Sequence, residues 1–244
     1  MMKENKNVWL NEEVAKNFLD NVRGSLPLSK EQIEIVLKLI NHTQKKVNRF
    51  LDLGCGDGIL GNAILVEHPE SNGIFLDFSE TMINAAKEKL KSFNDRSEFV
   101  TLDYGNINWY KDLADNNFDV IVSGFSIHHQ SDERKKAIYK EIYDLLVPGG
   151  IFLNLEHVLV KSDYIENFAN ELIIDSLFSY QKKKNPLITR EKVKKYFLER
   201  DDKDANILAS VENQCEWLKE IGYKHVDCYF KWFMAGLFGG IKTL

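Results

Sequence analysis

The stretch RFLDLGCGDGILG, which begins at Arg49, has the composition of a ligand-binding turn. It places four glycines and two aspartates directly behind a short apolar run. Glycine lets a backbone bend sharply and lets a ligand approach the main chain closely. The glycines from Gly56 onward formally satisfy G-x-G-x-x-G, the dinucleotide fingerprint, but a pyrophosphate would meet the carboxylates of Asp52 and Asp57. The two charges therefore favour a cationic ligand over one that carries phosphate.

The segment LDLGCGDG resembles the first motif of class I S-adenosylmethionine-dependent methyltransferases. Their cofactor has an ammonium group, a sulfonium centre and no phosphate. The resemblance implies a D-x-G-x-G-x-G loop around the methionine part of the cofactor, which Asp52, Gly54, Gly56 and Gly58 would form. Asp57 lies inside the same loop and faces either the ligand or solvent.

Two later motifs in the same order extend the resemblance. In FLDFSETMI, Asp77 ends a strand at the position where the family binds the ribose hydroxyls with an acid. Phe78 and Met82 would then pack near the adenine. In VTLDYGNI, Asp103 ends the next strand, where the family usually contacts the adenine amino group, and Tyr104 follows it.

The fourth and fifth motifs complete the series. FDVIVSGFSIHH, which contains Ser123 and Gly124, resembles the segment that passes beneath the transferring methyl, and LLVPGGIFLNLE resembles the approach to the fifth strand. The resemblance is dense from Phe50 to Glu156 and looser over the last two strands. It implies S-adenosyl-L-methionine as the cofactor, and Arg23 is a candidate partner for the cofactor carboxylate.

Candidate catalytic and substrate-binding residues follow the fourth and fifth strands. His128 and His129 lie where a methyl acceptor would approach, and a histidine can take up a proton near neutral pH. A base is needed only if the acceptor arrives protonated. Glu156 and His157 would lie at the same sheet edge and bind an amine or hydroxyl, and Trp232 would form a wall of the substrate pocket.

The sequence leaves several functions open. The main prediction is methyl transfer to a small-molecule nucleophile through N, O or S. The tail WLKEIGYKHVDCYFKWF also resembles carboxy-S-adenosylmethionine synthases, which need cationic residues for an added carboxylate. A non-catalytic module that binds the cofactor is a third possibility, and a nicotinamide-dependent oxidoreductase is disfavoured by the two acidic residues of the loop.

Composition narrows the partners and the compartment. The formal net charge of −5 argues against a nucleic-acid partner, and no apolar run is long enough to span a membrane. Cys55, Cys215 and Cys228 show neither metal-ligand nor redox spacing, which indicates reduced thiols and a cytoplasmic protein. No His, Asp and Glu cluster suggests a metal. A small-molecule substrate and a monomer or homodimer are expected.

Short apolar runs that alternate with amphipathic segments must position these residues. This alternation predicts an α/β fold with a doubly wound, mostly parallel seven-stranded sheet. The first five strands are expected at Arg49–Leu53, Gly73–Asp77, Glu98–Leu102, Asp119–Ser123 and Gly150–Glu156. A helix beginning near Ser29 is expected to be capped by a Ser29–Gln32 capping box.

The chain is expected to form a single methyltransferase domain, residues 1–244, in four parts. An N-terminal helical region covers 1–48 and the cofactor-binding core covers 49–156. A helical cap, inserted at 157–208, interrupts the alternation. The last helix and a final strand pair occupy 209–244, with Gly222 as the helix C-cap.

Overall fold

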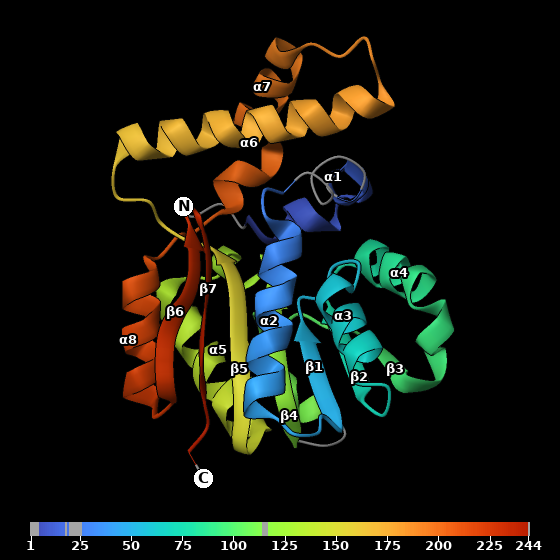
Figure 1. Cartoon of the computed structure of the whole chain (residues 1–244), viewed down its shortest axis with the longest axis vertical. Helices are drawn as coiled ribbons and strands as arrows, with labels where there is room; N and C mark the ends of the chain where they lie inside the picture. The colour runs from blue at the N-terminus through green and yellow to red at the C-terminus, as the bar shows by residue number, and fades with distance from the viewer. Residues whose placement is uncertain (1–4, 18, 20–25, 114–116, 244) are drawn as a thin grey trace.

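The apolar run ahead of the glycine loop forms an interior strand of a seven-stranded sheet in a computed structural model (Figure 1). The structure describes residues 5–17, 19, 26–113 and 117–243. The strands are β1 (Arg49–Leu53), β2 (Asn72–Asp77), β3 (Ser97–Thr101), β4 (Phe118–Gly124), β5 (Leu146–His157), β6 (Lys224–Trp232) and β7 (Ala235–Ile241). The five strands expected first are all present, and β5 begins at Leu146 rather than Gly150.

The sheet is mixed rather than wholly parallel. Its strand order is β3-β2-β1-β4-β5-β7-β6. Neighbouring strands from β3 to β5 pair in parallel, whereas β7 runs antiparallel to both β5 and β6. The final strand pair is thus an antiparallel hairpin, and its second strand is enclosed by β5 and β6.

Helices cover both faces of the sheet. Along β1, Phe50 packs into a cluster with α2 (Ser29–Thr43), α3 (Ile59–Glu67) and α4 (Glu80–Lys89). The next residue, Leu51, packs into the opposite cluster, which includes α5 (Asp132–Leu145) and α8 (Val211–Ile221). Alternate residues of a strand point to opposite faces, so this arrangement confirms the doubly wound architecture.

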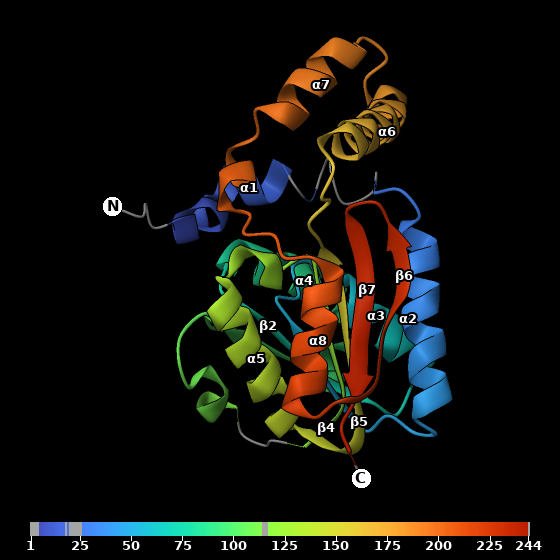
Figure 2. The same cartoon turned by 90° about the vertical axis from the view of Figure 1, so that its left-hand side faces the viewer.

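The remaining described elements are short or lie at one end of the sheet. Residues 157–208, expected to form a cap, contain α6 (Asp163–Lys184) and α7 (Arg190–Leu198), which lie beyond one end of the sheet in both views (Figures 1 and 2). The others are η1 (Asn5–Leu10), α1 (Glu12–Asn17), η4 (Lys91–Arg96), η5 (Trp109–Asp112), η6 (Ile127–His129) and η7 (Asp201–Ala205). The division of the chain into four parts stays a prediction.

The two helix caps expected from the sequence have different outcomes. Gly222 is the C-cap of α8, as expected, with φ of 117°. Its N–H donates to the carbonyls of Leu218 and Lys219. The Ser29–Gln32 capping box is wrong. Leu28 precedes α2 in the left-handed region, and Gln32 Nε2 instead donates to the carbonyl of Pro27 at 3.1 Å.

Candidate active site

The glycine loop after β1 depends on positive φ angles. Gly54, Gly56 and Gly58 have φ of 65°, 55° and 74°, a region that side chains disfavour. A Cβ atom on Gly54 would lie 1.9 Å from Ser126 Oγ, whereas one on Gly56 would have no atom within 4 Å. The loop therefore packs against the segment after β4 at Gly54 and faces open space at Gly56.

Asp77 joins the end of β2 to this loop. Its carboxylate accepts hydrogen bonds from the backbone N–H of Gly56 at 3.0 Å and of Ser79 at 2.9 Å. Burial raises the pKa of Asp77, and these hydrogen bonds oppose that rise. The carboxylate lies at the rim of a pocket and can accept further donors from a ligand.

That pocket, here called the glycine-loop pocket, brings together six of the residues expected to bind the cofactor. They come from the start of α4, which contributes Met82, and from the ends of β1, β2 and β4, which meet at the carboxyl edge of the sheet. The six are Gly54, Gly56, Asp77, Phe78, Met82 and Gly124.

Other residues expected at the cofactor lie behind the pocket and hold its walls. The buried carboxylate of Asp52 accepts the N–H of Gly61 at 2.8 Å, at the start of α3. Ser123 Oγ donates to the carbonyl of Leu53 at 2.8 Å, and Asp57 forms an ion pair with Lys89. These contacts fix the loop, and none of the three predicted residues is part of the pocket lining.

The remaining predicted cofactor residues have varied surroundings. Asp103 accepts the N–H of Gly105 at 2.7 Å, and the buried Tyr104 hydroxyl lies 2.5 Å from Ser126 Oγ. Gly58 precedes α3 as its N-cap. Arg23 lies outside the described residues.

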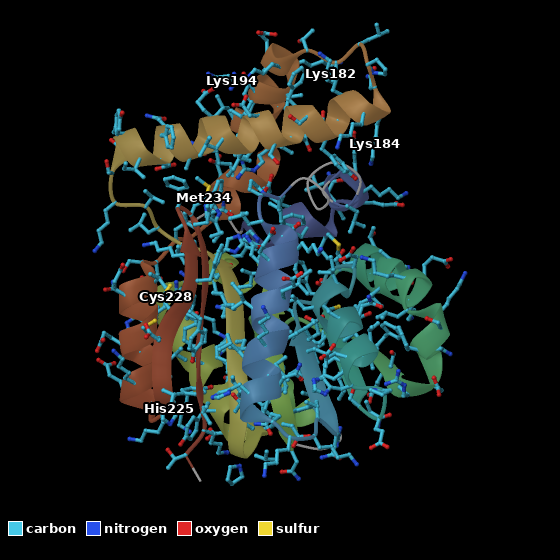
Figure 3. The ribbon with its side chains drawn as sticks, viewed as in Figure 1. Lys182, Lys184, Lys194, His225, Cys228 and Met234 are labelled. Atoms are coloured by element: carbon cyan, nitrogen blue, oxygen red, sulfur yellow. The ribbon has the colours of Figure 1, made fainter. Side chains whose placement is uncertain are left out.

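A second pocket, here called the cap pocket, opens beneath α6 and α7. Ile173 of α6 and Phe197 of α7 contribute apolar walls, as does the predicted Trp232. Met234, after β6, packs against the inner face of α6 and α7 beneath the cap (Figure 3). The cap thus provides an apolar roof above the ends of β4 and β5.

The floor of the cap pocket is polar. His128, His157, Arg200 and Asn206 all contribute to its lining. The Arg200 side chain is largely buried, with Nε 3.2 Å from Asp202 Oδ2 and Nη1 donating to the Phe197 carbonyl at 2.7 Å. Among the described residues, no acceptor contacts its Nη2.

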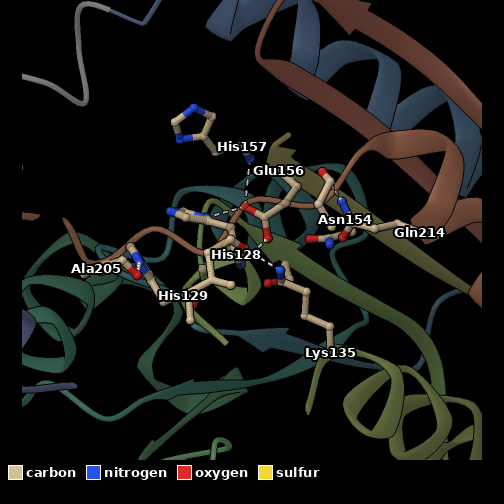
Figure 4. Close-up of polar contacts among 12 residues, drawn as sticks. His128, His129, Lys135, Asn154, Glu156, His157, Ala205 and Gln214 are labelled. Atoms are coloured by element: carbon tan, nitrogen blue, oxygen red, sulfur yellow. Dashed lines mark hydrogen bonds and ion pairs between the residues drawn. The ribbon is translucent and has the colours of Figure 1, made fainter. Parts of the chain in front are cut away.

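Glu156 lies under this floor and holds His128 (Figure 4). It is fully buried. Oε2 accepts the backbone N–H of His128 at 3.0 Å, and Oε1 accepts that of His157 at 2.8 Å. Oε1 also lies 2.5 Å from His128 Nδ1. Glu156, expected to bind substrate, does not line the pocket and instead positions His128, whose ring also interacts with the Asn206 side chain.

His129 differs from its neighbour because both of its ring nitrogens have partners. Nε2 accepts the indole N–H of Trp9 at 3.1 Å, and Nδ1 lies 3.3 Å from the carbonyl of Ala205. A carbonyl only accepts, so Nδ1 carries the proton and the ring is neutral. Burial is the main cause that lowers the pKa of both His128 and His129 to about 3.

The donors present suit an organic cation and give no sign of a metal. Within the part of the chain that the structure describes, no group of His, Cys, Asp and Glu could hold a metal ion. Burial raises the pKa of the Cys55 thiol, so it stays protonated and inert. The open face of Gly56 and the Asp77 carboxylate fit a ligand that offers hydroxyl groups and no phosphate.

Sequence reasoning missed several residues of the two pockets. Trp9 and Phe125 line both pockets, and Asn206 lines the cap pocket. Trp9 and Asn206 reach the site through tertiary packing and lie in none of the motifs, whereas Phe125 lies within the fourth motif, FDVIVSGFSIHH, directly after Gly124. Phe125 has a left-handed φ of 51°, a backbone conformation that a phenylalanine in the sequence does not predict.

Comparison with known proteins identifies the core of the chain. Residues 50–150 match the model of a methyltransferase domain. This core is therefore similar to the methyltransferase domains of the class I, Rossmann-like type. Within the described ranges, no helix combines the length and apolar character needed to cross a bilayer.

Carboxy-S-adenosyl-L-methionine synthases are among the curated relatives that match almost the whole chain. The chain is 26% identical to the carboxy-S-adenosyl-L-methionine synthase of Nautilia profundicola, over 93% of this chain and 91% of that protein. The synthase of the same name from Helicobacter pylori is also 26% identical, over 98% and 96% of the two chains.

Solved structures share the fold. A Methanococcus maripaludis protein described as an S-adenosyl-l-methionine-dependent methyltransferase matches with a TM-score of 0.60 at 24% identity, over 96% of this chain and 94% of that one. Human N-acetylserotonin methyltransferase in complex with SAM has a TM-score of 0.62 at 16% identity, over all of this chain and 60% of that one.

Proposed function

We propose that this chain is an enzyme that binds S-adenosylmethionine in the glycine-loop pocket and adds a carboxylate to it, forming carboxy-S-adenosylmethionine. The observation that carries the proposal is the guanidinium of Arg200 on the floor of the cap pocket, beside His128 and His157. The name shared by the curated relatives, which match over almost the whole chain, supports the same reaction.

The binding half of the proposal rests on Asp77 and the glycine loop. Asp77 would accept hydrogen bonds from the ribose hydroxyls, and the open face of Gly56 would admit the methionine part of the cofactor. When bound, the cofactor supplies a methyl carbon activated by a positively charged sulfur.

The chemical half requires a cation and a proton acceptor. With carbon dioxide, or a donor that releases it, as the carboxyl source, the methyl carbon loses one proton and forms a carbon–carbon bond to carbon dioxide. The product therefore carries one more negative charge than S-adenosylmethionine, and one proton is released. Arg200, whose Nη2 has no acceptor among the described residues, would bind the carboxylate. His128 Nε2 would accept the proton, and Glu156 would stabilise the resulting imidazolium.

Mass spectrometry of the released ligand tests this function. The purified full chain should release a compound heavier than S-adenosylmethionine by one carbon dioxide. R200Q should release S-adenosylmethionine without that compound. R190Q is the matched control, because Arg190 pairs with Glu171 and Asp175 and does not line the pocket. A chain that binds no adenosyl compound would overturn the proposal.

Methyl transfer to a small-molecule nucleophile is a second candidate. The neutral His128, held by Glu156 with Nε2 toward the cap pocket, favours it because an alcohol or ammonium acceptor must lose a proton. Formation of S-adenosylhomocysteine on addition of a metabolite extract, with no carboxylated product, would favour this reaction.

A further inference from the structure

Three ring-bearing residues are common to the two pockets. Trp9 of η1, Phe125 after β4 and His129 of η6 line both the glycine-loop pocket and the cap pocket. They are named here the aromatic partition. A group transferred between ligands in the two pockets must pass this partition, because it is where the two cavities meet.

Contacts from three elements hold the partition in place. The Trp9 indole N–H donates to His129 Nε2, and the two ring centroids are 5.7 Å apart at an angle of 54°. Phe125, at φ of 51°, donates its backbone N–H to the carbonyl of Leu155 in β5 at 2.7 Å. Left-handed backbone at a large side chain is strained and concentrates at functional sites.

The partition carries no formal charge. His129 is neutral, since burial and the neighbouring His128 lower its pKa to about 3. Asp77 lies in the glycine-loop pocket and Asp202 in the cap pocket, so neither is shared by the two cavities. The stabilisation that the partition itself gives a positive ligand atom would therefore come from its aromatic rings.

We propose that the aromatic partition binds the sulfonium centre of S-adenosylmethionine and discriminates against the uncharged thioether S-adenosylhomocysteine. The inference rests on the proposed binding of the cofactor in the glycine-loop pocket. Aromatic rings attract a cation placed over their faces, and the attraction increases when water is excluded. The partition would thus select the sulfonium form of the cofactor, which the proposed reaction uses, over the uncharged thioether.

Calorimetric titration of the full chain with each compound tests the selectivity. The wild type is expected to bind S-adenosylmethionine more tightly than S-adenosylhomocysteine. In W9L, the ratio of the two affinities should fall by about 3-fold to 30-fold, the range expected from loss of one cation–π contact. W9F, which keeps a ring but loses the indole N–H, should retain most of the ratio.

Two further variants complete the test. H129L should also lower the ratio of the two affinities. It provides the test of the aromatic partition if W9L does not fold. Y164L removes an aromatic ring from α6 that is 79% exposed and should leave the ratio unchanged. An unchanged ratio in W9L and H129L would overturn this inference, whereas failure of the wild type to bind either compound would overturn the proposed function itself.

Discussion

Glu156 contacts His128 twice, although 28 residues separate them in the chain. One carboxylate oxygen accepts the backbone N–H of His128, and the other lies 2.5 Å from its ring Nδ1. The end of β5 thereby fixes both the position of η6 and the orientation of the imidazole. This geometry makes Glu156 a positioning residue and directs Nε2 toward the cap pocket.

E156Q should slow product formation by about 10²-fold to 10⁴-fold, because the amide cannot stabilise an imidazolium. In the wild type, the rate should rise with pH through about 7, the value to which burial raises the pKa of Glu156, since the ionised form is the active one. This rise of the rate with pH should be absent in E156Q. Turnover measured by mass spectrometry across pH, with cofactor affinity as the control, checks both. Equal pH profiles in the two proteins would contradict the role given to Glu156.

Acid should destabilise the folded chain from about pH 6.5 downward. Burial lowers the pKa of His128, His129 and His157 to about 3, so below pH 6.5 the unfolded chain binds protons that the folded chain does not. Glu156 acts in the opposite sense, because its pKa is raised and its ionised form is the less stable one when folded.

The net uptake of about two protons on unfolding should reduce the free energy of unfolding by on the order of 2 kcal/mol per pH unit near pH 5. Urea titrations between pH 5 and pH 8 measure this slope. H157F should reduce the slope, whereas H42Q, at an exposed site on α2, should not. A free energy of unfolding that does not change over this range would contradict the lowered pKa values of these three histidines.

Two glycine substitutions should separate folding from binding. G54A places a methyl group against Ser126 and should lower stability by about 2 kcal/mol or more, because it combines a clash with left-handed backbone. G56A should lower stability by only about 1 kcal/mol, since its methyl group meets open space. That methyl group projects into the glycine-loop pocket, so G56A should still weaken cofactor binding. Thermal unfolding and calorimetry distinguish the two, and equal effects of both variants on both measurements would be the contrary result.

D77N should weaken S-adenosylmethionine binding by about 10-fold to 100-fold. The amide keeps one acceptor for the N–H of Gly56 or Ser79 but loses charge and one acceptor for the ribose. D95N on η4 is the control, because Asp95 does not line the pocket. If D77N binds S-adenosylmethionine as tightly as the wild type does, the Asp77 carboxylate does not contact the cofactor.

K135M should lower the free energy of unfolding by about 2 kcal/mol. Lys135 is fully buried, and its ammonium group binds Asp132 at 2.7 Å and the carbonyl of Ile207. K140M is the matched control, since its pair with Asp144 is exposed and should contribute less than about 1 kcal/mol. Ile207 donates to the His128 carbonyl at 2.9 Å, so the loss should also loosen the floor of the cap pocket. Equal stability of the two variants would contradict this assignment.

The sequence predicts those parts of the site that a local pattern determines. β1 has the predicted boundaries, and the glycines, Asp77, Phe78 and Met82 gather as the motif implies, because strand ends in a parallel sheet share one edge. Asp52 shows where a local sequence pattern no longer predicts the role of a residue. Its type fits a ligand contact, but its orientation toward the N–H of Gly61 is set by the path of α3.

The sequence predicts far fewer of the residues that line the cap pocket. Arg200 reaches its floor only because η7 returns to the sheet, and Trp9 reaches both pockets only because η1 packs near η7. These placements depend on contacts between segments almost 200 residues apart, which no periodicity or spacing encodes.

The place of β7 between β5 and β6 has a consequence for biosynthesis. A nascent chain that has already emerged through β6 still lacks the strand that joins β6 to β5. Until residues 235–241 arrive, β5 presents an open edge to solvent or to a chaperone, and unpaired edges invite association with other chains. Completion of the sheet between β5 and β6 must therefore wait for these residues to emerge.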